Sequence, residues 1–279
     1  MKDIHWYPGH MKKATIQIED KLKIVDCVIE LLDARIPLSS RNNELFKLTK
    51  NKKRLVVLTK TDLADETVTN NWIEKFKNEG FEAIFANLND NKDINKIIKH
   101  AENLGSEKHT KEIARGMKPQ PIRAMIIGIP NVGKSTLINK IAKRKAASVE
   151  NKPGHTKSQQ WIKVSNKFEL LDTPGILMSS YDDKLKAIRL ALVGSINNNI
   201  LPIEDLANYL LDFLKEYYQE DLMKRYDILS CDKSNQELLN DIAKRRGFKR
   251  NDEFDIEKAE ILLLNEFKNG LIAKASLER

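Results

Sequence analysis

Short apolar runs alternate with longer amphipathic stretches through the first two thirds of the chain. Apolar runs at 24–34, 54–60, 81–87, 122–128 and 168–175 predict buried strands, and residues 161–166 are typical of an edge strand. Helical patterns separate most of them: one covers 68–80 and ends on Gly80, and another begins on Asp93 as N-cap and stops at Gly105. This alternation predicts a mainly parallel sheet with helices on both faces.

The pattern changes after Gly175, where strand signals vanish and helical ones follow. Residues 106–121 are polar and end in two prolines, so they read as a connector that places a new strand. Residues 203–218 and 254–270 both carry apolar positions at helical spacing. We therefore expect an α/β domain over residues 1–178 and an all-helical domain over residues 179–279.

Composition narrows the functional classes. The chain has 279 residues, is 41% hydrophobic and carries a net charge of +8, which favours a polyanionic partner, although a generally basic proteome would give the same balance. Cys27 and Cys231 lie far apart and the five histidines show no ligand spacing, so a thiolate zinc site is not expected. No run reaches the ~20 apolar residues of a membrane span, and the first residues lack a signal pattern. We expect a cytoplasmic protein without a membrane partner.

A phosphate-binding motif lies near the middle of the chain. The stretch GIPNVGKS satisfies G-x-x-x-x-G-K-S through Gly128, Gly133, Lys134 and Ser135, after a predicted strand and before a helix start. Glycines let the backbone fold round phosphates, and amides at the helix N-terminus point at the anion. Lys134 would reach the β- and γ-phosphates and Ser135 would bind Mg²⁺. The predicted nucleotide contacts are Asn131, Val132, Gly133, Lys134, Ser135 and Thr136; the alternative is a chance Lys-Ser after a glycine turn.

The stretch TKTD, residues 59–62, would select guanine. The carboxylate of Asp62 can accept the N1–H and N2 amino hydrogens of guanine, a donor pair that adenine lacks, and Lys60 would lay its stem over the ring. Thr61 completes the predicted contacts. Thr59 stands where Asn is usual, so one contact to the base and to the P-loop is lost or replaced in part by a hydroxyl. Alone, such a string is also typical of a strand that runs into a helix cap.

Two further stretches complete a GTPase pattern. LLDTPG places Asp172 at a strand end, suited to hold Mg²⁺ through water, and Gly175, whose amide can contact the γ-phosphate. NKPGHTKSQQ precedes that strand and offers Thr156 as the switch-one threonine. Ser135, Thr156 and Asp172 are thus the predicted Mg²⁺ ligands.

The guanine motif precedes the P-loop, which reverses the usual order. A site built from loops at one sheet edge does not depend on which loop comes first, so chain ends can be moved where the old termini can be joined. Residues 106–121 would be the joining segment and the domain would end just after Gly175. This predicts a circularly permuted P-loop GTPase domain followed by an all-helical domain.

Three stretches resemble a known family of permuted GTPases. HWYPGHMKKA (5–14), LLDARIPLSSRN (31–42) and GIPNVGKSTLIN (128–139) are similar to the ribosome biogenesis GTPase A (RbgA, YlqF) family. The resemblance implies GTP or GDP as ligand, a role late in maturation of the large ribosomal subunit, and binding to its precursor and to rRNA. It also places Asn87 and Leu88 of FANLN at the base. We expect a monomer and no DNA partner.

The hydrolytic step needs a substitute for a missing residue. Ile176 follows DTPG where a water-orienting Gln is usual, which predicts slow intrinsic turnover. His10 is our candidate for the missing element, the alternative being that the N-terminal arm only packs on the sheet. Asn131 resembles the potassium-binding residue of cation-activated GTPases, the alternative being a loop cap. His10, Asn131 and Lys134 are therefore the predicted catalytic residues, and K⁺ joins Mg²⁺ as a predicted cofactor.

The helical domain is the predicted RNA contact. The chain continues from Gly175 through residue 176 directly into that domain, so a contact between Gly175 and the γ-phosphate could control the affinity of the domain for RNA. AKRRGFKR (243–250) is the predicted patch, although basic residues in a last helical turn also complement the helix dipole. Two other functions stay open from the sequence: a P-loop small-molecule kinase, and a scaffold that binds GTP with negligible turnover.

Overall fold

A six-stranded sheet organises the first part of the chain. The computed structural model describes residues 9–146, 161–173, 175–177, 183–196, 201–250 and 253–279, without the side chains of 9–14 and 143–146. The strand order is β3-β2-β1-β4-β6-β5, and every neighbouring pair is parallel except β5 with β6. The strands are β1 Cys27–Asp33, β2 Lys53–Thr59, β3 Glu82–Phe85, β4 Ile122–Ile127, β5 Trp161–Lys163 and β6 Phe168–Leu171. The predicted mainly parallel sheet, with an edge strand after residue 160, is confirmed.

The strand order explains how a permuted chain keeps an ordinary domain. The P-loop strand β4 lies at the centre between β1 and β6. If the chain began at β4, the sheet would be completed by β5 and β6 on one side and then by β1, β2 and β3 in sequence on the other. Strands β2 and β3 would then each lie beside the strand that precedes them, whereas β5 would lie at the edge before β6 takes the place next to β4, and β1 would take the place on the other side of β4. The chain order, not the sheet, has been changed.

Alternate residues of the strands face different helices. On β2, Val56 and Leu58 belong to the core under α3 (Glu66–Asn78), whereas Leu55 and Val57 belong to the larger core that includes α4 (Asn91–Ala114). Since successive side chains of a strand point to opposite faces, α3 and α4 cover opposite sides of the sheet. The other helices of this part are α1 Gly9–Leu22, α2 Asn43–Leu48 and α5 Lys134–Ala146.

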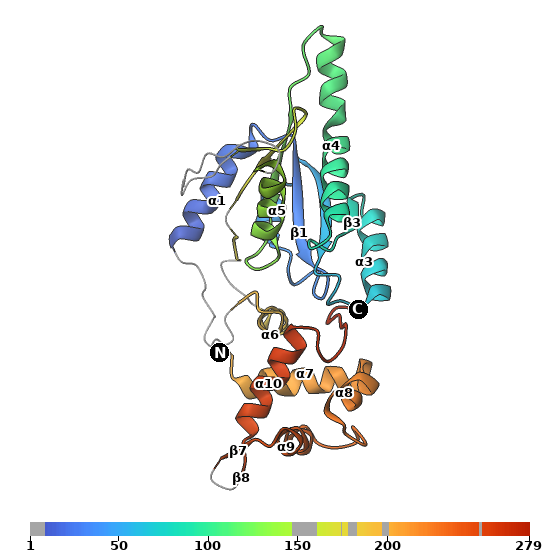
Figure 1. Ribbon diagram of the computed structural model, residues 1–279. Coiled ribbons are helices and arrows are strands. Elements are labelled where there is room, and N and C mark those ends of the chain that lie inside the picture. Colours follow the sequence, from blue (N-terminus) through green and yellow to red (C-terminus); the bar gives the residue numbers. More distant parts are fainter. Residues whose placement is uncertain (1–8, 147–160, 174, 178–182, 197–200, 251–252) are drawn as a thin grey trace.

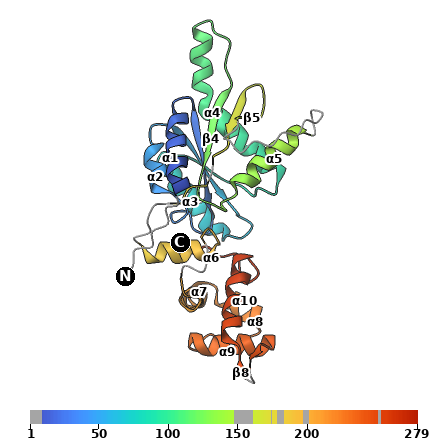
Figure 2. The same cartoon turned by 90° about the vertical axis from the view of Figure 1, so that its left-hand side faces the viewer.

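Helix α4 is longer than the sequence pattern predicts. The expected start at Asp93 and the expected end at Gly105 are wrong, since the helix runs to Ala114 with Asp90 as its N-cap, and the connector predicted over 106–121 is shortened to 115–121 before β4. Gly105 lies inside the helix because the chain passes close there: a Cβ at this position would lie 2.4 Å from Cγ2 of Ile122. The C-terminal end of α4 projects beyond the sheet (Figures 1 and 2).

Among the described residues after Gly175, five helices make up most of the chain. They are α6 Lys184–Leu192, α7 Ile203–Tyr217, α8 Gln219–Tyr226, α9 Asn235–Arg246 and α10 Ile256–Lys268. The predicted helices at 203–218 and 254–270 are present as α7 and α10, which contact each other. A hairpin of β7 (Lys249–Arg250) and β8 (Glu253–Phe254) was not predicted; it follows Gly247, whose left-handed φ of 67° ends α9 and turns the chain.

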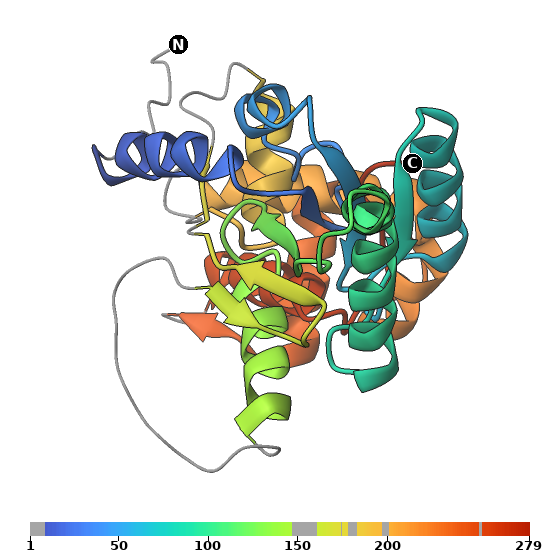
Figure 3. The same ribbon diagram turned by 90° about the horizontal axis from the view of Figure 1, so that it is seen from above.

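The helical part lies against one end of the sheet. Strand β1 points toward α6, so the helices lie beyond the carboxyl ends of the strands (Figure 1). Seen from above, the orange and red helices lie behind the blue and green elements of the sheet (Figure 3). Ligands of open α/β sheets bind beyond these carboxyl ends. The helical part therefore borders the edge at which the predicted motifs lie.

Candidate nucleotide site

The P-loop joins β4 to α5 through a backbone that few residues can adopt. Gly128 has φ 155° and Gly133 has φ 109°, and a Cβ at these positions would lie 2.8 Å from Leu31 O and 2.7 Å from Leu88 Cδ1, respectively. Asn131, with φ 61°, is the non-glycine residue in the left-handed region here. Helix α5 then begins at Lys134, so its free N–H groups face the loop. The loop has the conformation that a phosphate cradle requires.

Lys134 is held inside this loop. Its side chain donates to the carbonyl oxygens of Gly128 at 2.8 Å and Ile129 at 2.6 Å, and the residue is 6% exposed. Burial lowers the pKa of Lys134 to about 8, and the charge of Asp172 opposes this shift. Burial likewise raises the pKa of Asp172, against the effect of Lys134. An ammonium that is desolvated but satisfied by loop carbonyls is well suited to exchange these partners for phosphate oxygens.

The segment after β6 lies directly against the P-loop. A Cβ on Gly175 would lie 2.9 Å from Lys134 Nζ and 3.0 Å from Pro130 Cα, so a side chain there would press against the P-loop. Ile176 N donates to Gly128 O at 3.4 Å. The Ile176 side chain is 1% exposed and its carbonyl accepts from Asn42 Nδ2 at 2.9 Å. Ile176 is thus a packed core residue.

The predicted guanine loop follows β2 and is joined to the P-loop. Thr59 is buried, and its hydroxyl lies 2.7 Å from Val132 O and 3.0 Å from Leu32 O, so the hydroxyl does reach the P-loop in place of the usual amide. Lys60 adopts a left-handed φ of 56°. Asp62, two residues on, is exposed. The structure therefore places Asp62 at the carboxyl edge, on a loop tied to the phosphate cradle.

The two amides predicted to contact the base from the loop after β3 differ in their hydrogen bonding. Asn87 N donates to Asp93 Oδ2 at 2.7 Å, so this amide is already satisfied within the protein. Leu88 N has no acceptor among the described residues, and the Leu88 side chain is buried against Gly133. Of the pair, the Leu88 amide is therefore the one without an acceptor in the described part of the chain.

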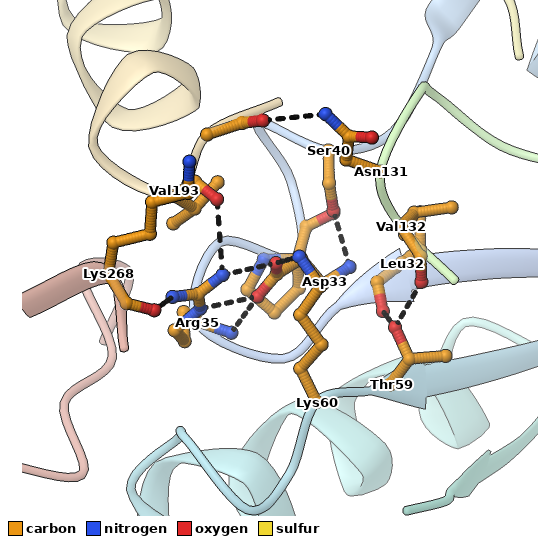
Figure 4. A network of polar contacts seen from close by, with 12 residues as sticks. Leu32, Asp33, Arg35, Ser40, Thr59, Lys60, Asn131, Val132, Val193 and Lys268 are labelled. Atoms are coloured by element: carbon orange, nitrogen blue, oxygen red, sulfur yellow. Dashed lines mark hydrogen bonds and ion pairs between the residues drawn. The ribbon is translucent and has the colours of Figure 1, made fainter. Parts of the chain in front are cut away.

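Asp33 and Arg35, which were not among the predicted site residues, lie at the centre of a buried polar network (Figure 4). Asp33 Oδ2 accepts from Arg35 Nη2 at 2.8 Å and from Lys60 Nζ at 3.0 Å. Arg35 also donates to Lys268 O at 3.1 Å and Val193 O at 3.4 Å, at the ends of α10 and α6. One carboxylate therefore joins the guanine-loop lysine to the helical part. The only sequence signal was the buried-strand end LLDAR itself.

Burial alone would raise the pKa of Asp33, but the cations beside it reverse the effect. The Arg35 guanidinium and the Lys60 ammonium together hold the pKa of Asp33 at about 2, so the carboxylate stays ionised although it is fully buried.

Asn131 makes a second link between the P-loop and the helical part. Its Nδ2 donates to Gly194 O at 2.8 Å, just after α6 (Figure 4). Because the amide nitrogen must face that carbonyl, the Oδ1 atom is turned the other way and is left to accept. Asn131 is thus neither a plain spacer nor a cap of its own loop.

Some predicted site residues are exposed, and others lie partly or wholly outside the described part of the structure. Ser135 and Thr136 are exposed in the first turn of α5. The His10 backbone lies in α1 but its side chain is outside the described part, and Thr156 lies outside the described residues altogether. Within the described residues there is no group of three or more His, Cys, Asp or Glu side chains that could hold a metal ion. Nor does any helix there have the length and hydrophobicity to cross a bilayer.

A parallel sheet with a P-loop, a D-x-x-G segment and a guanine loop at one edge defines a P-loop GTPase, here with the guanine motif before the P-loop. A sequence model of the family described as 50S ribosome-binding GTPase matches residues 123–241, which begin at the P-loop strand.

Full-length relatives extend the match across the chain. Ribosome biogenesis GTPase A of Bacillus cereus is 45% identical, over 99% of this chain and 93% of its own length. GDP-bound YlqF aligns with a TM-score of 0.64 at 28% identity, over 94% of this chain and 98% of its own. GNP-bound YlqF from T. maritima aligns with a TM-score of 0.62 over 96% and 98%. The chain belongs to the ribosome biogenesis GTPase A family, which confirms the resemblance.

Proposed function

We propose that this GTPase binds GTP and GDP with Mg²⁺ at the carboxyl edge and acts in assembly of the large ribosomal subunit. The observation that carries the proposal is the approach of Gly175 to the P-loop, where a Cβ would lie 2.9 Å from Lys134 Nζ. A contact this close allows the same phosphate to meet both elements. The family relationship supports ribosome assembly as the setting.

The residue roles follow from these positions. Lys134 and the amides of the P-loop would hold the β- and γ-phosphates, and Asp62 would read guanine, with Lys60 released from Asp33 to cover the base. The exposed Ser135 hydroxyl and the partly buried Asp172 fit a Mg²⁺ site, with Thr156 as third protein ligand. Mg²⁺ would neutralise charge on the phosphates. The remaining predicted contacts are Thr59, Thr61, Asn87, Leu88, Asn131, Val132, Gly133, Thr136 and Gly175.

Co-sedimentation with large-subunit precursors tests the proposed function. Wild-type protein is expected to bind GDP but not ADP, and to sediment with the particle more in a non-hydrolysable GTP analogue than in GDP. Equal sedimentation in both nucleotides would refute control by nucleotide state. We expect the protein to act as a cytoplasmic monomer on the particle and its rRNA.

Water activation in the site is proposed to depend on His10. Ile176 is packed in the core and cannot orient water, so another residue has to do so. His10→Ala should slow single-turnover hydrolysis on the particle by roughly 100-fold, in the range of a lost acid–base group, with unchanged GTP affinity. Unchanged turnover would remove His10 from the mechanism.

Asn131 is proposed to hold K⁺ beside the phosphates. The free Oδ1 atom described above supports this role, because an amide oxygen is a suitable ligand for a hard cation. Turnover should be faster in potassium chloride than in sodium chloride at equal ionic strength, and Asn131→Ala should remove the difference. Equal rates in both salts for the wild type would contradict the proposal.

The basic patch at 243–250 is a proposed rRNA contact through its least constrained members. Arg245, Arg246 and Arg250 have carboxylate partners in Asp227, Glu266 and Glu257, at 2.5, 3.5 and 3.8 Å. Lys244 and Lys249 have no ion pair in the described part of the chain. Residues 1–178 and 179–279 would then act as nucleotide-binding and RNA-binding units, respectively.

Charge reversal separates RNA contact from structural pairing. Lys244→Glu with Lys249→Glu should weaken particle binding without changing GDP affinity. The control reverses Lys224, an exposed lysine of the helical part that lies outside 243–250 and makes no ion pair with the described residues, and should bind as the wild type does. Equal loss in both variants would show a general effect of net charge.

A further inference from the structure

The last ten residues, which we call the C-terminal segment (270–279), return from α10 to the sheet. In Figure 1 the C-terminus lies at the end of α3, beside the carboxyl edge and away from the bulk of the helical part. Much of the segment is buried there: Ser276 is 0% exposed and Glu278 is 5% exposed. A charged side chain is rarely buried unless it is paired, so the contacts of Glu278 define how the segment is held.

Glu278 fixes the segment to the loop after β1. Its carboxylate accepts from the backbone N–H groups of Leu38 at 2.6 Å and Ser39 at 3.0 Å, and from the Ser39 hydroxyl. The Glu278 carbonyl accepts from Trp72 Nε1 at 3.0 Å. Such charge-assisted bonds to backbone amides are strong and directional, so this end of the segment has a defined position.

The middle of the segment is bonded to the guanine loop itself. Ala275 N donates to Leu63 O at 3.2 Å, and Ser276 Oγ accepts from Asp65 N at 3.2 Å. Leu63 also lies so close to Gly270 that a Cβ there would be 2.8 Å from Leu63 Cδ2. These contacts fall on the first and third residues after Asp62.

Tyr218 of the helical part contacts both Ser276 and Asp65. Its hydroxyl accepts from Ser276 N at 3.1 Å and lies 3.2 Å from Asp65 Oδ2. The guanine loop is therefore held on its N-terminal side by Thr59 and the P-loop, and on its C-terminal side by residues that belong to the opposite end of the sequence.

The position of Asp62 matters because base recognition is a matter of geometry. A carboxylate has to meet two donors at once, and a displacement of ~0.5 Å is enough to weaken such a site. Asp62 is exposed, and a cavity of about 160 Å³ lined by Thr61, Ala64 and Lys274 lies beside the loop, so space exists for the loop to shift. The segment supplies hydrogen bonds that oppose such a shift.

We propose that the C-terminal segment positions Asp62 through Ser276 and Ala275, and so sets how strongly the site prefers guanine. Ser276 is thus a positioning residue, contributed by the helical part, for a nucleotide held by the sheet. This inference rests on the proposed function, since it presumes that Asp62 reads the base.

The test compares two nucleotides that differ at one group. IDP lacks the N2 amino group of GDP, so it loses one of the two donors that Asp62 would accept. Ser276→Ala should weaken GDP binding about 5-fold, from the loss of one buried hydrogen bond at the loop, and IDP binding less than about 2-fold. The ratio of the two affinities should therefore fall, while single-turnover hydrolysis of bound GTP stays unchanged.

A matched control variant and a second test variant complete the experiment. Ser106→Ala on α4, a serine whose hydroxyl bonds within its own helix, should leave the ratio unchanged. Tyr218→Phe, which removes the hydroxyl that holds Ser276 N, should lower the ratio in the same direction and serves if Ser276→Ala does not fold. Equal weakening of GDP and IDP, or no change in either, would overturn the positioning role. If the wild type failed to prefer GDP to ADP, the proposed function itself would fail.

Discussion

Replacement of Arg35 is expected to be among the most costly changes at the interface between the two parts of the chain. The Arg35 and Asp33 side chains are 2% and 0% exposed, and Arg35→Ala removes three donated side-chain bonds at 3.1 Å or less, besides the one to Val193 O. The Asp33 carboxylate would be left in the interior with Lys60 as its remaining cation. Loss of one partner of a buried pair costs about 3–5 kcal/mol, because the other charge stays desolvated.

Urea unfolding followed by tryptophan fluorescence measures this loss. Trp72 is a suitable reporter because it donates to Glu278 O, at the junction of both parts. The matched control is Arg245→Ala, which breaks a 2.5 Å pair with Asp227 whose arginine side chain is 50% exposed. An exposed pair of this kind contributes at most about 1 kcal/mol, so the control should unfold at nearly the wild-type urea concentration.

A double variant distinguishes an unpaired charge from lost packing. Arg35→Met with Asp33→Asn removes both charges and leaves Lys60, which is 24% exposed, free to turn to water. We expect this variant to be more stable than Arg35→Ala alone. The reasoning would be refuted if Arg35→Ala cost less than about 1 kcal/mol, or if the double variant were the less stable of the two.

Three further predictions rest on the same structure. Lys134 has a pKa of about 8 in the free protein, so it should take up about 0.8 proton at pH 8.5 and about 0.1 proton at pH 7 when nucleotide phosphates bind. Calorimetry in buffers of different ionisation enthalpy measures this uptake, and an uptake that does not depend on pH would contradict the prediction. The pKa of Asp33 is lowered from 3.8 to about 2 in the folded state, so its ionised carboxylate adds roughly 2 kcal/mol to the free energy of unfolding above pH 3.8. This contribution is lost as the pH falls toward 2, and Asp33→Asn should remove this part of the acid sensitivity measured in urea titrations. Gly105→Ala should lower the free energy of unfolding by about 1–3 kcal/mol, because the new methyl group would overpack Ile122. Gly116→Ala strains a backbone with φ 71° but meets no atom within 4 Å, so its cost should not exceed about 1 kcal/mol.

The motif-bearing strands could be predicted because their signals are local. A strand that ends in a glycine-rich loop before a helix start, as at Gly128, constrains the backbone within a few residues. The mainly parallel arrangement also follows from strands that alternate with helices, whereas the strand order was not predicted. The α4 boundaries could not be predicted from periodicity, because Gly105 reads as a helix end unless the close approach of Ile122 is known. That approach joins residues distant in sequence.

The polar network could not be predicted for a related reason. Asp33, Arg35 and Lys60 carry ordinary signals of strand ends, and their partners at Val193 and Lys268 are backbone carbonyls, which every residue has. Nothing in the sequence marks one carbonyl as an acceptor. Likewise, Ser276 and Glu278 lie in a stretch without periodicity, so their contacts depend on where α10 ends. Long-range contacts to backbone atoms leave little trace in sequence.

These contacts change how a signal from the γ-phosphate would pass to the helical part. From the sequence, the signal was expected to pass by one route, along the chain from Gly175. The structure adds contacts at Asn131 with Gly194, at Arg35 with two helix ends, and at Ser276 with the guanine loop. A reorientation started at Gly175 has to rearrange or pivot about all of them, and a coupling of ~1–3 kcal/mol is the usual size of an allosteric effect. The Arg35 pair is buried and the Asn131 contact is partly buried, so any such reorientation would have to keep or break both of them as well as follow the chain from Gly175.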